Sequence, residues 1–358
     1  MKICYVATDV VIPHFRGAST HVFEVAKHLT ELNNEVYVIS RRMSINQPNF
    51  EKINGFHVYR VYRGIAAPLP FSKYEQPETS KKKTLKAKVY EKYLFTVFPL
   101  YTSLYTAHLI KKHDLEIILE RETSFGAGAL ASVVSGKPLV LEIIGPRYSK
   151  LSFRKAKKVL AYTKSMIHES PIPEKVAFVD AAADTELFRP DSDQRIRIRN
   201  LYGFSSDIVV GYVGMFVSWH GVKELVDASV EIIKHAPSVK FLMVGPYFEQ
   251  VKAYTQRKTV KDNFVFTGPI PYEKVPAFVN AMDVALAPYN PSKSSLRSRY
   301  GIGSPLKIFE YMACGKPVIT TSVEPIPTII EHMENGVLIP PGDCKALACL
   351  LYTSDAAD

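Results

Sequence analysis

Short apolar segments typical of buried strands alternate with segments of helical periodicity, and this alternation constrains the fold more than any other feature. In the first half we expect strands at residues 2–8, 36–40, 58–61, 117–119, 138–144, 158–162 and 176–179. In the second half we expect strands at residues 208–216, 239–245, 263–267, 284–288, 318–321 and 337–340. Strands that alternate with helices form parallel sheets covered on both faces. The sequence therefore predicts an α/β protein of two doubly wound, Rossmann-like domains that face a central cleft.

The chain has 358 residues, enough for two domains of ordinary size. We predict a first domain at 1–190, a polar linker at 191–205 and a second domain at 206–348. Residues 349–358 resemble a translated sequencing adapter, so we exclude them and expect an incomplete second domain in a C-terminally truncated chain. The four cysteines show neither a pairing pattern nor metal-type spacing, which favours the reduced cytoplasm.

A basic and aromatic segment lies in the first half of the chain. The net charge of +10 permits nucleic acid, anionic lipid or phosphorylated ligands as partners, and selects none of them. Residues 81–93 carry six lysines, aromatic residues follow to residue 105, and Pro99 is expected to divide the segment into two helices. Such a segment can lie on an anionic membrane surface. The alternative is a peripheral helix with a solvated lysine face. Nucleic-acid binding is not expected, because no recognition motif accompanies the lysines.

Residues 304–317 predict a helix with both ends marked. Ser304 is expected to cap its N-terminus, with Pro305 at the first helical position. Gly315 and Pro317 are expected to end it. The helical spacing predicts one face toward the core and another toward the cleft. The core-facing stripe comprises Leu306, Phe309, Met312 and Ala313. The face toward the cleft comprises Ser304, Lys307 and Tyr311.

Lys307 lies in the first turn of this helix, where the helix dipole disfavours a cation. A lysine beside free backbone N–H groups is explained if an anion completes the site. Glu310 follows on roughly the same face and could accept hydrogen bonds from hydroxyl groups. The alternative is an i,i+3 ion pair on a solvated face, worth about 0.2–0.5 kcal/mol.

Polar residues also follow the strands of the first domain. Glu120 and Arg121 end one predicted strand and Glu142 lies near the end of another. The loop after the first strand contains Arg16, Gly17, Ala18 and Ser19. These residues should gather at the carboxyl edge of the sheet, where doubly wound sheets bind ligands. The alternative for Glu120 and Arg121 is mutual pairing. The loop lacks a G-x-G-x-x-G sequence, so nicotinamide binding is weakly supported.

These segments, taken in order, resemble the GT-B glycosyltransferases of the retaining family 4 type (glycosyl transferases group 1). The resemblance covers nearly the whole chain and is strongest at residues 304–317. It also includes Val213-Gly214, Trp219-His220-Gly221, residues 283–289 and residues 335–343, and in the first half Glu120-Arg121, residues 138–142 and residues 184–190.

The resemblance implies transfer of a sugar from a nucleotide-diphosphate-sugar to a glycan or lipid-linked acceptor hydroxyl, with retention of configuration and without metal or cofactor. It assigns Glu310 to the ribose, the start of the 304–307 helix to the diphosphate, and the base to the region of Phe266 and Thr267. The donor-binding residues it implies are Gly214, Met215, Trp219, Gly221, Phe266, Thr267, Gly303, Ser304, Pro305 and Leu306. The acceptor-side residues are Arg16, Gly17, Ala18, Ser19, Glu120, Arg121 and Glu142.

Some positions depart from the family pattern. Ile302 stands where the family often has a second glutamate, and Met215 and His220 stand where it commonly has arginine and lysine. We expect Lys307 to replace the missing positive charge with help from His220, which would act best when protonated. Arg16-Gly17 and Ala182-Ala183 also depart from common pairs and loosen the assignment in the first domain.

Three further interpretations remain beside the transferase. One is a non-catalytic nucleotide-sugar-binding protein, and another is a sugar-nucleotide epimerase on the same fold. The third, nucleic-acid binding, rests on the lysines of residues 81–92 alone. For the transferase, the catalytic residues would be Lys307, Glu310 and His220, and we expect a cytoplasmic location, peripheral at the inner face of the membrane if residues 81–105 bind lipid.

Overall fold

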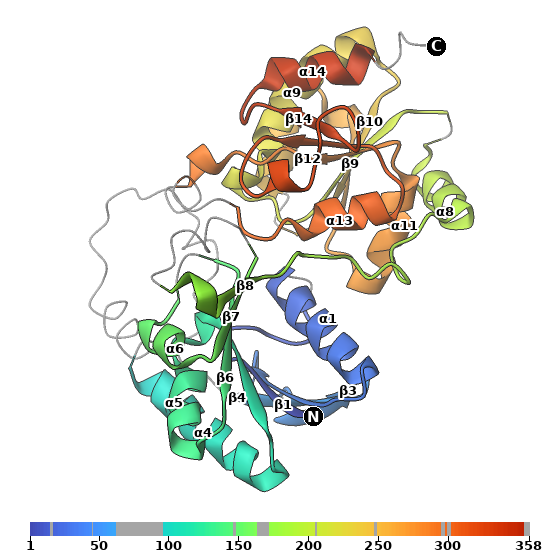
Figure 1. Ribbon diagram of the computed structural model, residues 1–358. Helices are drawn as coiled ribbons and strands as arrows, with labels where there is room; N and C mark the ends of the chain where they lie inside the picture. Colours follow the sequence, from blue (N-terminus) through green and yellow to red (C-terminus); the bar gives the residue numbers. More distant parts are fainter. Residues whose placement is uncertain are drawn as a thin grey trace, which may run out of the picture. The chain divides into compact units, whose positions relative to one another are not determined.

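The computed structural model describes residues 1–14, 17–44, 46–61, 96–145, 148–162, 172–204, 206–246, 249–294, 298 and 302–353. The chain divides into two compact units, Met1–Asp180 and Ala181–Asp358, called unit 1 and unit 2 below. Each contains a mainly parallel sheet between helices (Figure 1). The predicted pair of doubly wound domains is therefore confirmed.

Unit 1 contains a sheet in the order β3-β4-β2-β1-β5-β6-β7-β8, parallel except where β3 runs antiparallel to β4. Its strands are β1 (Lys2–Ala7), β2 (Glu35–Arg41), β3 (Phe50–Ile53), β4 (Phe56–Val61), β5 (Ile117–Arg121), β6 (Leu139–Ile143), β7 (Lys158–Ala161) and β8 (Val176–Phe178). Its helices are α1 (Gly17–Glu31), α4 (Val97–His113), α5 (Ala127–Ser135) and α6 (Lys150–Lys155), with 3-10 turns η1 (Glu122–Ser124) and η2 (Pro173–Lys175). The strand order reverses between β1 and β5, which is the position where such sheets bind ligands.

Unit 2 contains a fully parallel sheet in the order β11-β10-β9-β12-β13-β14. Its strands are β9 (Val209–Val213), β10 (Lys240–Val244), β11 (Phe264–Gly268), β12 (Val284–Ala287), β13 (Val318–Thr321) and β14 (Val337–Ile339). Its helices are α8 (Ser192–Tyr202), α9 (Val222–His235), α10 (Glu249–Arg257), α11 (Val275–Ala281), α13 (Leu306–Ala313) and α14 (Cys344–Thr353). Its 3-10 turns are η3 (Ser218–His220), η4 (Lys261–Asn263), η5 (Tyr272–Lys274), η6 (Pro291–Lys293) and η7 (Ile326–Thr328).

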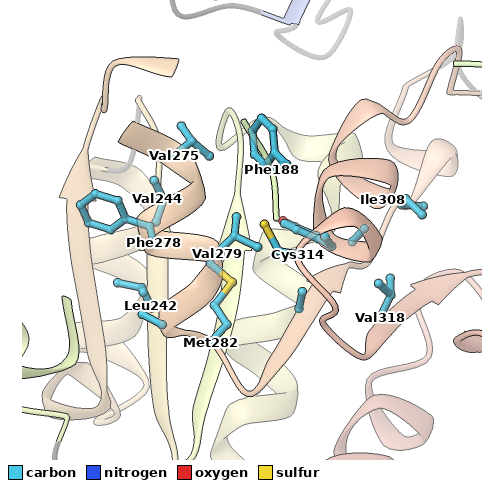
Figure 2. Close-up of a cluster of buried hydrophobic side chains, with 14 of the residues drawn as sticks. Phe188, Leu242, Val244, Val275, Phe278, Val279, Met282, Ile308, Cys314 and Val318 are labelled. Carbon is cyan, nitrogen blue, oxygen red and sulfur yellow. The ribbon is translucent and has the colours of Figure 1, made fainter. Parts of the chain in front are cut away.

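Each sheet separates two apolar cores. In unit 1, α1 covers one face, and α4, α5 and α6 cover the other. In unit 2, α9 and α14 cover one face, and α8, α11 and α13 cover the other. Figure 2 shows the latter core, where Phe278 of α11 lies beside Leu242 and Val244 of β10. Burial of these side chains fixes α11 and α13 on the face that carries the residues discussed below.

The predicted linker at residues 191–205 is wrong. Residues 192–202 form α8, which packs against α11, and the division between the units falls at Asp180. The Asp191 carboxylate accepts a hydrogen bond from the Gln194 N–H, and Gly203 ends the helix with φ of 72°. The polar composition of this segment therefore belongs to a capped surface helix.

Three other expectations also differ from the structure. Pro99 lies in the first turn of α4 and does not interrupt it, because the missing N–H costs nothing there. The sequence also favours a helix at residues 326–333, where the structure has only the turn η7. Residues 349–353 belong to α14, and Leu351 is buried in the core beside α9, whereas residues 354–358 lie outside the described residues.

Two glycines of unit 2 give a test of its backbone. Gly221 and Gly203 have φ of 70° and 72°, but a Cβ on Gly221 would lie 1.6 Å from the Pro288 carbonyl oxygen, whereas one on Gly203 meets nothing within 4 Å. We expect Gly203→Ala to cost about 1–2 kcal/mol of unfolding free energy through left-handed strain alone. Gly221→Ala should cost about 3 kcal/mol or more, because the backbone must move. Urea unfolding of the two variants measures this; equal losses would contradict the contact.

Candidate functional site

The helix α13 begins one residue later than a serine cap would require. Pro305 occupies the N-cap position and no side chain caps the helix, so the prediction that Ser304 is the cap is wrong. The Ser304 hydroxyl oxygen is instead buried and has no hydrogen-bond partner among the described residues. The Ile308 N–H donates to the Pro305 carbonyl oxygen at 2.9 Å. Among the described residues, the Ser304 hydroxyl and the N–H groups of the first two helical residues, Leu306 and Lys307, are thus left for a ligand.

The buried face of α13 also differs from the predicted stripe. Ile308, Tyr311 and Cys314 are buried, whereas Leu306 and Phe309 are only half-buried, so the helix is rotated relative to the expectation. The reason is Tyr311, whose hydroxyl accepts a hydrogen bond from the Val213 N–H at 2.8 Å. A tyrosine can enter a core when its hydroxyl has a backbone partner. The prediction that Tyr311 faces a cleft is therefore wrong.

The amine of Lys307 is buried among aromatic rings. Its Nζ atom is buried and has no hydrogen-bond partner among the residues that the structure describes. Lys307 as a whole residue is half-buried. Nζ lies 4.2 Å from the ring centroid of Tyr212 and 5.3 Å from that of Tyr289. Burial lowers the pKa of Lys307 to about 7, against an opposing effect of Glu310. The alternative of an ion pair on a solvated face is therefore excluded.

Glu310 is buried one turn further along α13. The Tyr272 hydroxyl donates a hydrogen bond to its Oε1 atom at 3.0 Å. Tyr272 comes from η5, and its ring packs 5.4 Å from that of Phe188. The carboxylate is thus oriented by a side chain that is itself held in place.

His220 ends η3, which follows β9. Its Nδ1 atom lies 2.7 Å from the Met215 carbonyl oxygen and 2.8 Å from the Tyr212 hydroxyl. The backbone carbonyl can only accept, so Nδ1 carries a proton in this arrangement. Trp219 lies at 4.0 Å from the His220 ring and stacks on Tyr289. Met215 and Trp219 thus frame the histidine.

The other predicted donor-binding residues lie at the carboxyl ends of the strands or just before α13. Gly214 follows β9 with φ of 142°, and a Cβ there would lie 2.7 Å from Lys307 Nζ. Phe266 and Thr267 end β11, where Phe266 packs against Phe216. Gly221 begins α9, and Gly303, Pro305 and Leu306 lead into α13. The structure therefore brings Gly214, Met215 and His220 together with Lys307.

The residues predicted for the acceptor side include Glu142, which lies in a buried polar cluster of unit 1. Glu142 is buried and accepts hydrogen bonds from the hydroxyls of Tyr5 at 2.6 Å and Tyr162 at 2.9 Å. Its Oε1 also lies 2.7 Å from His21 Nε2, and Arg121 Nη1 is 3.9 Å from Oε2. Burial alone would raise the pKa of Glu142, but His21, Arg121 and these hydrogen bonds lower it to about 2.

Arg121 and the neighbouring Glu122 are buried at the end of β5. The Nε and Nη1 atoms of Arg121 have no hydrogen-bond partner among the described residues. Burial raises the pKa of Glu122 to about 7, with Arg121 opposing this effect. Arg121, Glu122 and Glu142 therefore gather where the strand order reverses, as the sequence predicted for Arg121 and Glu142.

Glu120 has another role. Its two carboxylate oxygens accept hydrogen bonds from the N–H groups of Gly126 and Ala129, each at 3.0 Å, and so bind the start of α5. Both the acceptor-side assignment and the pairing with Arg121 are corrected for this residue. Gly17 and Ala18 are exposed at the start of α1 and Ser19 is buried. Arg16 lies outside the described residues.

Sequence reasoning missed Tyr212, Tyr289 and Tyr272. Each tyrosine contacts a residue that the sequence did single out, namely Lys307, His220 or Glu310. A buried tyrosine in a strand is usually a core residue, so only its position two residues before Gly214 could have drawn attention to Tyr212.

A comparison with protein families gives one match. Residues 207–352 match the family model described as glycosyl transferases group 1. This region lies within unit 2 and contains the whole of the Lys307 site described above.

Comparison with curated proteins gives relatives of the same class. The chain is 28% identical over 192 residues to a GDP-mannose-dependent alpha-(1-6)-phosphatidylinositol monomannoside mannosyltransferase of Mycolicibacterium smegmatis, a match that covers 53% of this chain and 50% of that enzyme. It is 24% identical over 369 residues to an uncharacterized glycosyltransferase of Methanocaldococcus jannaschii, covering 92% of this chain and 83% of that protein.

Among solved structures, the chain is similar to HepE of Anabaena in complex with UDP and glucose. The TM-score is 0.72 at 20% identity, and the match covers 100% of this chain and 90% of the other. The predicted GT-B fold is therefore confirmed. The family model and the two curated relatives are glycosyltransferases by name, which supports the resemblance inferred from the motifs.

The buried amine of Lys307 predicts that the free energy of unfolding depends on pH. A lysine normally titrates near 10.5, and here its pKa is lowered to about 7, so the unfolded state binds the extra proton between these values. Unfolding free energy should therefore rise with pH across this window, by up to about 1.4 kcal/mol per pH unit from this group. Urea unfolding of wild type and Lys307→Met, without nucleotide, should show a difference that moves in favour of wild type as pH rises.

The exposed Lys345 of α14 supplies the control. Lys345→Met should differ from wild type by the same amount at every pH. A pH-independent difference for Lys307→Met as well would contradict the buried, uncharged amine.

Proposed function

We propose that the chain is a retaining family 4 glycosyltransferase that moves a sugar from a nucleotide-diphosphate-sugar to an acceptor hydroxyl. The single observation that carries the proposal is Lys307, whose buried amine has no hydrogen-bond acceptor among the described residues and lies beside the start of α13. An anion at this position would give the amine its missing partner and would also bind the free N–H groups. The match to glycosyl transferases group 1, and the similarity to a structure in complex with UDP and glucose, support this choice of anion.

In this proposal the donor lies along the start of α13. The diphosphate contacts Lys307, the Ser304 hydroxyl and the first N–H groups of the helix. Glu310 accepts hydrogen bonds from the ribose hydroxyls, and the base lies near Phe266 and Thr267. The buried position of Glu310, oriented by Tyr272, suits a fixed hydrogen-bond acceptor.

The chemistry is the departure of a nucleoside diphosphate. Negative charge develops on the leaving phosphate as the bond to the sugar breaks, and Lys307, His220 and the helix N–H groups stabilise that charge in a site with little water. A proton that Lys307 gains in the presence of the phosphates would restore its full charge, since a nearby anion raises the pKa of an amine. The positive groups supplied by the chain then perform the role that a metal ion would otherwise take.

The proposed acceptor side is unit 1, at the carboxyl ends of β5 and β6. Arg121 and Glu142 are buried there, and the Nε and Nη1 atoms of Arg121 have no hydrogen-bond partner in the described part of the chain. A glycan or lipid-linked acceptor offers hydroxyl oxygens that could accept hydrogen bonds from these nitrogens. The M. smegmatis relative is named for a phosphatidylinositol monomannoside acceptor, which supports a lipid-linked class.

Glycosyl transfer is tested with a panel of nucleotide-sugars and with Lys307→Ala, Glu310→Ala and the surface control Lys345→Ala. We expect nucleoside diphosphate release from one donor in wild type and in the control. Lys307→Ala should lower kcat by about 10²-fold, because it removes a group that stabilises the leaving charge. Glu310→Ala should act mainly on KM, because the ribose contact is the same in the ground and transition states.

Product analysis by NMR should show that the anomeric configuration of the donor is kept. Nucleotide-sugar binding without release of diphosphate from any donor would support the non-catalytic binding protein instead. Equal activity of Lys307→Ala and wild type would sink the assignment of Lys307.

The second part of the proposal concerns a membrane surface. Residues 62–95, including most of the predicted 81–105 segment, lie outside the described residues. Within the described part, α4 exposes a row of apolar side chains: Val97 is 53% exposed, Leu100 54%, Tyr101 50% and Leu104 56%. Lys111 and Lys112 are exposed at the end of the same helix. No helix among the residues that the structure describes has the length and apolar character of a membrane span. From the exposed apolar row and the two lysines, we propose a peripheral contact of α4 with anionic lipid at the cytoplasmic face.

Co-sedimentation with phosphatidylglycerol vesicles tests this contact. Leu100→Glu with Leu104→Glu should abolish the binding, because the apolar row would carry charge into the interface. The control is Val134→Glu, which replaces an exposed apolar residue of α5 and should bind as wild type does. Binding of the α4 variant at the wild-type level, or binding to neutral vesicles alone, would contradict the proposal.

A further inference from the structure

The ammonium of Lys307 is held by the faces of aromatic rings. Its Nζ lies 4.2 Å from the centroid of Tyr212 and 5.3 Å from that of Tyr289, and no hydrogen-bond acceptor is in reach among the described residues. A ring face attracts a cation without occupying its N–H groups in a strong hydrogen bond. The rings therefore fix where the amine lies while its donors stay available to an anion.

The hydroxyl group of Tyr212 contacts a second residue, His220. This hydroxyl donates a hydrogen bond to the Met215 carbonyl oxygen at 2.7 Å, and it lies 2.8 Å from His220 Nδ1. His220 Nδ1 lies 2.7 Å from the same carbonyl. These three atoms therefore contact one another pairwise. This arrangement fixes the imidazole and directs its Nδ1 proton toward the carbonyl and hydroxyl oxygens.

We propose that Tyr212 is the positioning residue of the donor site, with its ring holding Lys307 and its hydroxyl holding His220, so that both act on the same diphosphate. This inference rests on the proposed function and names a residue that the sequence did not single out. Tyr212 is suited to this role because it is fully buried in β9 and has only two side-chain torsions. Its ring packs edge-on against Phe216 at 5.4 Å, which limits its rotation.

The backbone next to Tyr212 is shaped for the same contact. Gly214 adopts φ of 142°, and a Cβ at this position would come within 2.7 Å of Lys307 Nζ and 3.1 Å of the Tyr212 hydroxyl oxygen. The glycine therefore leaves room for both groups at once. Met215 takes part through its carbonyl oxygen, so these two hydrogen bonds do not depend on its apolar side chain.

The two arms of Tyr212 can be separated by substitution. Tyr212→Phe keeps the ring and removes the hydroxyl, whereas Tyr212→Leu removes both. The matched control is Tyr254→Phe in α10, since Tyr254 also has lysines over its ring and a hydroxyl bonded to an acceptor, Asp227. Melting temperatures without ligand first establish that each variant is folded.

The measurement is the Kd of each variant for UDP, GDP and ADP and for the matching nucleosides without phosphate. For the diphosphate that wild type binds best, Tyr212→Phe should weaken binding several-fold and Tyr212→Leu on the order of tenfold or more, as loss of charged contacts predicts. Nucleoside binding should be unchanged, because the proposal assigns the ribose to Glu310, which Tyr272 orients, and not to Tyr212. Tyr254→Phe should behave as wild type.

A double-mutant cycle then separates positioning from a general loss of structure. In a His220→Ala background, Tyr212→Phe should cause no further loss of diphosphate affinity, because the hydroxyl acts through His220. In a Lys307→Met, His220→Ala background, Tyr212→Leu should likewise add nothing. Additive losses in these backgrounds, or equal losses of diphosphate and nucleoside binding, would overturn the inference and leave the proposed function intact. A wild type that binds none of the three diphosphates would overturn both.

Discussion

An ammonium group buried without a hydrogen-bond acceptor is costly, and the arrangement around β9 and α13 depends on how unit 2 tolerates one. With its pKa near 7 rather than 10.5, Lys307 costs on the order of 5 kcal/mol to charge in this environment. The packing of α13 forces this position on the side chain. Ile308 and Tyr311 enter the core, so the preceding residue lies on the flank that faces Tyr212. Apolar packing thus places an amine that lacks a hydrogen-bond acceptor among the described residues at the helix start, and a nearby anion would favour its charged form.

Unit 1 contains buried charges as well, but most of them have partners. Glu142 receives hydrogen bonds from two tyrosines and contacts His21, and these interactions outweigh burial in setting its pKa near 2. Glu122 accepts a hydrogen bond from the Ile144 N–H, and burial dominates its pKa of about 7. The difference follows from the number of donors around each carboxylate. Glu142 is therefore a fixed anchor of the polar centre, whereas Arg121 and Glu122 retain capacity for another partner.

The sequence predicted the two sheets because buried strands are recognisable from continuous apolar runs. It did not predict the rotation of α13, since Tyr311 and Phe309 are both apolar in a hydrophobic pattern. The hydrogen bonds of the Tyr311 hydroxyl with Val213 and Leu286 distinguish them. The linker at residues 191–205 failed for a related reason, because a helix with a polar surface has the composition of a loop. Lys307 stood out because its charge conflicts with its place in the helix. Tyr212 did not, because its partners lie about ninety residues away and in a neighbouring turn.

The departures from the family pattern acquire a physical meaning once the packing is known. Ile302, at the position where the resemblance would place a second glutamate, is buried in the same core as Ile308. A carboxylate there would be desolvated without a partner, which costs several kcal/mol. The contact that this glutamate would make with the donor sugar is thus absent, and the apolar side chain instead stabilises the segment before α13. Under the proposed function, recognition of the donor in unit 2 shifts away from the sugar and toward the diphosphate, where Lys307 and His220 take over the charge that Met215 lacks.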